Sequence, residues 1–174
     1  MIRMDLVKII IQETSDHQII VLKELDGERM FPILIGPYEA MAIDRRVKNI
    51  RAPRPLTHDL LNSTISSLGA SLERIVINDL RDNTFFAKLV VRSNGQELEI
   101  DARPSDAIAL ALRAGAPIYV NEQVLAEAAE SMSQMREDAE EIERFKDLMS
   151  DIDIPDIFPG SYRVPPEEKT EDEE

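Results

Sequence analysis

Residues 101–120 read DARPSDAIALALRAGAPIYV, and this stretch decides how the fold is assigned. From Ala107 to Leu112 it is wholly apolar, with alanine, isoleucine and leucine on every side of a helix. A helix that is apolar all round is typically buried between layers of a domain. Pro104 suits the first helical position, where its missing N–H costs nothing. We therefore expect a buried helix over residues 104–114.

Two sets of three strands are expected to precede helices in this chain. Apolar alternation predicts the second set at residues 72–78, 84–92 and 96–102. It predicts the first set at residues 5–11, 17–25 and 29–35. Helices are expected from Pro37 to about Lys48, over residues 56–68 up to Gly69, and again from about Glu122.

The two halves of this pattern are also similar in amino-acid sequence. PYEAMAI at residues 37–43 aligns with PSDAIAL at 104–110, an offset of 67 residues. LTHDLL at 56–61 aligns with VNEQVL at 120–125, an offset of 64. Such a period is too long for a solenoid repeat. The sequence predicts an α+β fold in which tandem, pseudo-duplicated β-β-β-α-α units form one domain over residues 1–130.

The rest of the chain is expected to be peripheral. Residues 131–159 form a predicted helical extension, because apolar residues recur at three- or four-residue spacing from Ser131 to Met149. This amphipathic helix could pack on its own core or build a homo-oligomer. Residues 160–174 have the composition of a disordered acidic tail.

Charge and composition narrow the class of protein. Residues 1–120 hold 16 acidic and 15 basic side chains, whereas residues 121–174 hold 18 and 5, so the acidity says little about what the body binds. No apolar run approaches the roughly 18 residues that span a bilayer. The start of the chain resembles a strand rather than a signal peptide. We expect a cytoplasmic protein with no membrane partner. The chain has no cysteine and therefore no disulfide or thiolate site.

A basic cluster follows the first predicted helix. Its members are Arg45, Arg46, Lys48, Arg51 and Arg54. They could complement the negative end of the helix dipole. They could also form a nucleic-acid-binding patch that contacts phosphates, although no aromatic residue lies among them to stack a base.

The internal match separates two kinds of polar residue. Glu39 and Asp106 both occupy the third position of a predicted helix, where a carboxylate can reach back to the cap residue. This repetition favours a role in starting the helices over a catalytic one. Asp101 and Arg103 have no polar counterpart in the first half. Both point to one face of the predicted strand, so they could pair with each other or contact a ligand together.

His58 is the histidine best placed for proton transfer. Thr57 is the expected N-cap, which puts His58 and Asp59 in the first turn of a helix, where the dipole favours a neutral imidazole. Four carboxylates could hold a hard cation such as Mg²⁺ or Mn²⁺, but no spacing forces them together. They belong to Glu39, Asp59, Asp101 and Asp106.

Three blocks resemble the signature of the bifunctional nuclease domain family. They are FPILIGPYEAMAI, RPLTHDLL and DARPSDAIALALRAGAPIYV, and the resemblance covers roughly residues 1–130. It implies a nuclease that acts on RNA and DNA, as plant members do. Matching the blocks singles out Glu39, His58, Asp59, Asp101, Arg103, Ser105 and Asp106.

The leading hypothesis is hydrolysis of phosphodiester bonds in single-stranded nucleic acid. Carboxylates centred on Asp101 would hold a divalent metal, Arg103 would contact the phosphate, and His58 would act as acid or base. The alternative is a non-catalytic regulatory module that binds a ligand or nucleic acid. No known catalytic constellation stands in the sequence, which leaves both open.

Overall fold

The computed structural model describes residues 1–11 and 17–130, so the predicted extension at 131–159 and tail at 160–174 lie outside the described residues. The strands are β1 Ile2–Ile10, β2 Gln18–Glu24, β3 Met30–Ile35, β4 Ser71–Arg81, β5 Thr84–Ser93, β6 Gln96–Ala102 and β7 Ile118–Val120. The helices are α1 Pro37–Val47, α2 Thr57–Ser67 and α3 Pro104–Ala114, and residues 122–130 are also helical. Every predicted strand and helix within the described residues is confirmed, with ends that differ by a few residues.

The strands form a seven-stranded sheet in the order β3-β2-β1-β7-β4-β5-β6. Each set of three is an antiparallel meander. The short strand β7 joins the two sets, because it pairs antiparallel with β1 and parallel with β4. This mixed sheet with its helices confirms the α+β class. A duplicated origin of the two sets stays a prediction.

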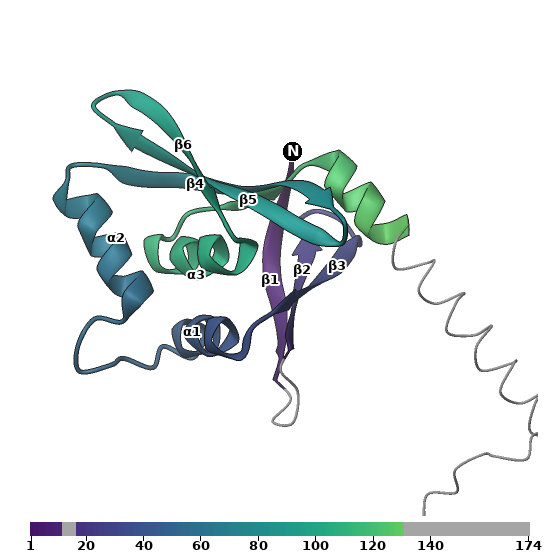
Figure 1. Cartoon of the computed structure of the whole chain (residues 1–174), viewed down its shortest axis with the longest axis horizontal. Helices are drawn as coiled ribbons and strands as arrows, with labels where there is room; N and C mark the ends of the chain where they lie inside the picture. The colour runs from purple at the N-terminus through teal and green to yellow at the C-terminus, as the bar shows by residue number, and fades with distance from the viewer. Residues whose placement is uncertain (12–16, 131–174) are drawn as a thin grey trace, which may run out of the picture. The chain divides into compact units, whose positions relative to one another are not determined.

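Helix α3 lies in the angle between the two halves of the strongly twisted sheet (Figure 1). Its apolar run from Ala107 to Ala111 is buried, as its composition predicts. The helix begins at Pro104 and ends at Gly115, whose φ of 70° is the left-handed conformation that commonly terminates helices. Helices α1 and α2 pack against α3. The first turns of all three helices supply the candidate site.

Two tight turns set the register of the second meander. Asn94 and Gly95 both have positive φ, the conformation that Asn-Gly commonly adopts in a tight hairpin turn, here between β5 and β6. Asp82 and Asn83 adopt the same left-handed region, with φ of 48° and 58°. They allow β4 to continue to Arg81 rather than to end near residue 78.

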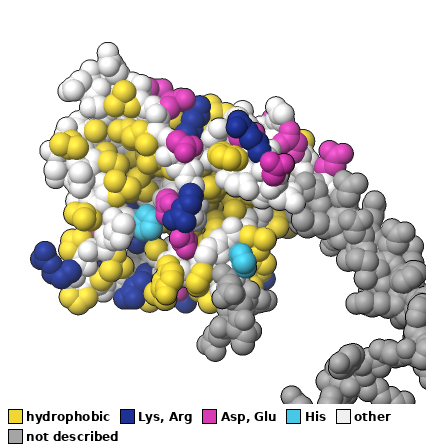
Figure 2. All heavy atoms as spheres, in the orientation of Figure 1, with side chains coloured by type: hydrophobic (Ala, Val, Ile, Leu, Met, Phe, Trp, Pro, Cys, Tyr) yellow, Lys and Arg dark blue, Asp and Glu magenta, His cyan; other side chains and the backbone are white. Residues whose placement is uncertain are grey.

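One apolar surface, here called the α2–β6 face, is left uncovered. Leu98 and Ile100 of β6 lie opposite the buried Val91 and Leu89, so they point to the core side of the sheet, yet they are 47% and 46% exposed. Helix α2 has no buried residue and exposes Leu60. Figure 2 shows apolar side chains gathered over this part of the molecule.

No helix within the described ranges is long and apolar enough to cross a membrane.

Candidate functional site

A chain of charged contacts joins the first turns of the three helices. Arg103, the N-cap residue of α3, donates from Nε to Asp106 Oδ2 at 2.7 Å and from Nη2 to Asp106 Oδ1 at 3.2 Å. The same guanidinium lies 3.0 Å from Glu39 Oε1 in α1. His58 Nε2 in α2 lies 3.2 Å from Asp106 Oδ1. We call these four residues the His58–Asp106 cluster.

Asp106 is the centre of this cluster and is held in its ionised form. Partial burial raises the pKa of Asp106, but hydrogen bonds from Arg103 and His58 outweigh burial, and the pKa is lowered overall. An ionised carboxylate only accepts hydrogen bonds, so His58 must donate from Nε2. In the neutral imidazole this leaves Nδ1 without a proton, which makes Nδ1 the basic nitrogen. The His58 side chain is 13% exposed, so its orientation is well restrained.

A second ion pair ties the next residue of α2 to α3. Arg113 Nε donates to Asp59 Oδ1 at 2.5 Å, and the Arg113 side chain is only 6% exposed. Arg113 also donates to the carbonyls of Ala109 and Ala42, at 2.8 and 3.2 Å. Burial raises the pKa of Asp59, but hydrogen bonds from Leu56 N–H and Arg113 lower it overall. The pair therefore locks α1, α2 and α3 together.

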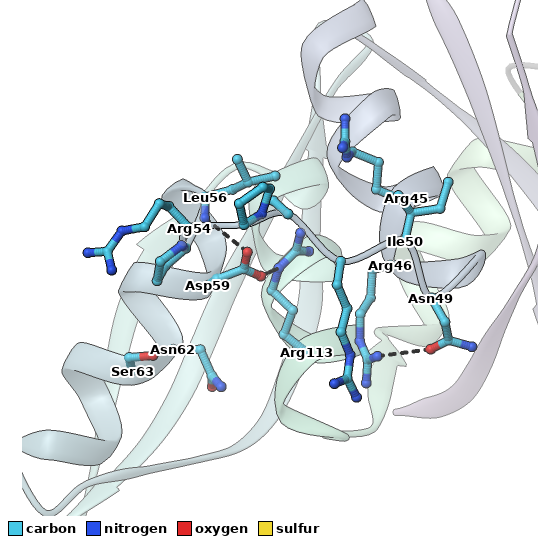
Figure 3. Close-up of a pocket in the computed structure, with 14 residues that line it drawn as sticks. Arg45, Arg46, Asn49, Ile50, Arg54, Leu56, Asp59, Asn62, Ser63 and Arg113 are labelled. Carbon is cyan, nitrogen blue, oxygen red and sulfur yellow. Dashed lines mark hydrogen bonds and ion pairs between the residues drawn. The ribbon is translucent and has the colours of Figure 1, made fainter.

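Asp59 and Arg113 also form part of an open pocket of about 530 Å³, the arginine pocket (Figure 3). Arginines dominate its lining: Arg45, Arg46, Arg51, Arg54 and Arg113. Apolar and polar neutral side chains complete it: Asn49, Ile50, Ala52, Pro53, Pro55, Leu56, Asn62 and Ser63. His58 and Asp59 are consecutive in the first turn of α2, so this one turn serves both the cluster and the pocket.

The predicted basic patch is therefore brought together around a cavity, with one exception. Lys48 Nζ pairs with Asp44 at 2.9 Å and does not line the pocket. Arg46 donates from Nε to the carbonyl of Leu112 at 2.9 Å, near the end of α3. Its guanidinium also donates to Asn49 Oδ1 at 3.2 Å. Arg46 thus complements a helix end and lines a pocket at the same time.

Asp101 is placed differently from the expectation. A pair with Arg103, one of the two arrangements that the sequence left open, does not form, because β6 ends at Ala102 and Arg103 turns away to pair with Glu39 and Asp106. Asp101 is exposed on the edge strand and lies opposite Lys88 of β5. Ser105, the second residue of α3, is buried.

Two expectations about helix starts are wrong in detail. The N-cap of α2 is Leu56 rather than Thr57, because the Asp59 carboxylate accepts from Leu56 N–H at 3.0 Å and so extends the helix start by one residue. Glu39 and Asp106 make their side-chain contacts to Arg103 and His58 instead of to the cap N–H groups. Both still lie in first turns, where the helix dipole favours a carboxylate.

Arg113 is the site residue that sequence reasoning missed. It stands near the end of an apolar helix, where a basic residue commonly interacts with the helix dipole. The available signal was a single charged residue within a helix expected to be buried. A buried charge requires a partner. That partner, Asp59, is 54 residues away in sequence and is not indicated by any local pattern.

The four predicted metal-binding carboxylates do not meet at one point. Glu39, Asp59 and Asp106 are each bound to an arginine, and Asp101 lies apart on β6. Within residues 1–11 and 17–130, no group of three or more histidine, aspartate or glutamate side chains could hold a metal ion. Mg²⁺ requires several oxygen ligands in close to octahedral geometry. The described residues therefore do not fit a metal centre built on this set.

Comparison with known proteins gives a matching family and several relatives. Residues 20–133 match the family described as the bifunctional nuclease domain. An uncharacterised protein of Mycobacterium tuberculosis is 40% identical over 157 residues, which cover 85% of this chain and 92% of that protein. Bifunctional nuclease 1 of Oryza sativa subsp. japonica is 28% identical over 118 residues, which cover 66% of this chain and 36% of the plant protein. Bifunctional nuclease 2 of Arabidopsis thaliana is 27% identical over 111 residues, covering 62% and 34%.

Proposed function

This chain belongs to the bifunctional nuclease domain family, and on that premise we propose that it is a cytoplasmic nuclease that hydrolyses phosphodiester bonds in single-stranded RNA or DNA. The chain spans only about a third of the plant nucleases, so their activity is extended to it as part of the proposal. The observation that carries the proposal is the shared first turn of α2, which presents His58 to Asp106 and Asp59 to the arginine pocket.

The proposed chemistry uses the chain's own residues. Arginines of the pocket bind the strand through its phosphate groups, because a guanidinium matches two phosphate oxygens at once and stays charged at neutral pH. His58 Nδ1 accepts a proton from the attacking water as its oxygen bonds to phosphorus. The bond to the leaving oxygen then breaks, and that oxygen takes a proton from His58 or from solvent.

The proposed test is cleavage of labelled single-stranded RNA and DNA by the pure chain. We expect His58→Ala to lower the rate about 10²- to 10⁴-fold, the usual contribution of an acid–base group. His17→Ala, which removes the other histidine of the chain, is the matched control. Cleavage that survives His58→Ala unchanged would reveal a contaminating enzyme or a different mechanism.

A metal requirement is a separate question that the same assay answers. Parallel reactions with Mg²⁺, Mn²⁺ or EDTA are compared for the wild type and for Asp101→Asn. Cleavage that needs a divalent cation and is lost in Asp101→Asn would support a metal bound through Asp101. Cleavage that persists in EDTA and in Asp101→Asn would support the route through His58 alone.

A non-catalytic binding module is the second candidate function. The observation in its favour is that Glu39, Asp59 and Asp106 are already bound to arginines inside the protein. Such pairs hold helices together without any reaction. Saturable binding of single strands with no cleavage under any condition of the assay would favour this candidate.

We also propose that the protein forms a homo-oligomer through the apolar stripe of residues 131–149. The α2–β6 face supports this, because Leu60, Leu98 and Ile100 offer an apolar surface to a second copy. Light scattering should give a multiple of 19.7 kDa for the full chain and the single-chain mass for Ile142→Glu. Glu140→Gln is the control on the same segment. A single-chain mass for the unaltered protein would contradict the proposal.

A further inference from the structure

The arginine pocket carries more positive charge than its own carboxylate can balance. Arg113 is paired with Asp59. In the described part of the chain, the other lining arginines have no carboxylate partner. These are Arg45, Arg46, Arg51 and Arg54. Four arginines without a carboxylate partner among the described residues therefore line a volume of about 530 Å³.

Arg45 differs from the other lining arginines in its exposure. Its Nε is buried and has no hydrogen-bond acceptor among the described residues, so this atom is not accessible from the open pocket. Arg46, Arg51 and Arg54 are exposed. An acceptor in the pocket would therefore be bound mainly by these three guanidinium groups.

The charge and the lining indicate the chemistry of that acceptor. An internal phosphodiester carries one negative charge, whereas a terminal phosphomonoester carries about −1.5 to −2 at neutral pH. The volume is within the range of about 300–1,000 Å³ that holds one small ligand. No aromatic side chain stands among the lining residues, so stacking on a base is not available.

We propose that the arginine pocket binds the terminal phosphomonoester of a nucleic-acid strand. This inference rests on the proposed function for its source of ligand, a single strand whose phosphorylated end enters the pocket. Arg51 and Arg54 line the pocket from the segment between α1 and α2. Arg45 and Arg46 line it from the last turn of α1. The strand is thereby held by its end, with the following nucleotide directed toward the first turn of α2.

The test is a binding assay that does not depend on cleavage. The full chain carrying His58→Ala is titrated against a labelled single-stranded oligonucleotide with a 5′-phosphate, a 3′-phosphate or hydroxyl groups at both ends, at one fixed salt concentration. We expect one phosphorylated end to bind at least about 10-fold more tightly than the hydroxyl-ended strand, as an added charge-assisted contact implies. Arg51→Ala and Arg54→Ala should each reduce this preference several-fold.

Lys23→Ala is the matched control, because it removes one cation that is paired with Glu28 on another part of the molecule. Equal affinity for phosphorylated and hydroxyl ends would overturn the inference, as would an equal loss of preference in Lys23→Ala and Arg51→Ala. A nucleoside monophosphate that binds as tightly as the phosphorylated strand would overturn the strand end as the source. If the end preference holds while the unaltered chain never cleaves, the nuclease proposal fails and the pocket assignment stands.

Discussion

Replacing Asp106 with asparagine is expected to lower the cleavage rate of the proposed nuclease by about 10²- to 10⁴-fold. Asp106 accepts the Nε2 proton of His58 and so keeps Nδ1 free to act as the base. An asparagine amide can present its NH₂ group to the imidazole and favour the opposite tautomer. The fold should survive, because asparagine has nearly the same shape as aspartate. Single-turnover cleavage rates of the two proteins measure the effect.

Further results are expected because Asp106 acts by positioning His58. The double variant His58→Ala/Asp106→Asn should be no slower than His58→Ala, because the two residues act as a unit. Asp106 should not contribute to the pH dependence of the rate above mildly acidic pH, since its pKa is lowered and it stays ionised there. A double variant whose loss of rate equals the product of the two single losses would contradict the role of Asp106 in positioning His58.

Arg103 and Glu39 provide a graded comparison. Arg103 contacts Asp106 directly, and Glu39 contacts Arg103, so each lies one step farther from His58. The loss of rate should therefore decrease from Asp106→Asn to Arg103→Gln to Glu39→Gln. This graded behaviour would not be expected if the cluster only fastened the helices together.

The sequence predicted elements well wherever the determining signals are local. Helix α3 begins at Pro104 and ends at Ala114 as expected, because a proline and an apolar period decide its extent. The turn at Asn94-Gly95 was predictable for the same reason. The exposure of Leu98 and Ile100 on the edge strand β6 was not predictable, because no pattern in this strand shows that the helices leave them uncovered.

The contacts of the candidate site depend on long-range pairing, which one sequence does not contain. His58 lies 48 residues from Asp106, and Asp59 lies 54 residues from Arg113. Strand alternation also placed Arg103 with Asp101, but the alternation ends where the chain turns into α3. Repetition of a carboxylate at Glu39 and Asp106 suggested a helix-starting role. In the structure both carboxylates lie in first turns, but they bind Arg103 and do not contact the cap N–H groups.

The largest effect on stability is expected at Arg113. Replacing it with methionine, which fills a similar volume, should lower the free energy of unfolding by about 3 kcal/mol, at the low end for a broken buried pair because Asp59 is 39% exposed. The variant loses the ion pair and leaves the carbonyls of Ala42 and Ala109 without this donor. Urea unfolding, with a lower midpoint and an unchanged slope, measures the effect.

Arg74→Met is the matched control, because Arg74 pairs with Glu97 between two strands and both side chains are partly exposed, at 29% and 40%. Exposed pairs contribute little to stability, so the control should unfold close to the wild type. Adding Asp59→Asn to Arg113→Met should recover part of the loss, because the carboxylate is then no longer left unpaired. Equal destabilisation by Arg74→Met and Arg113→Met would mean that Arg113 does not lock the three helices. In that case the shared first turn of α2 could not hold His58 and the arginine pocket in a fixed relation.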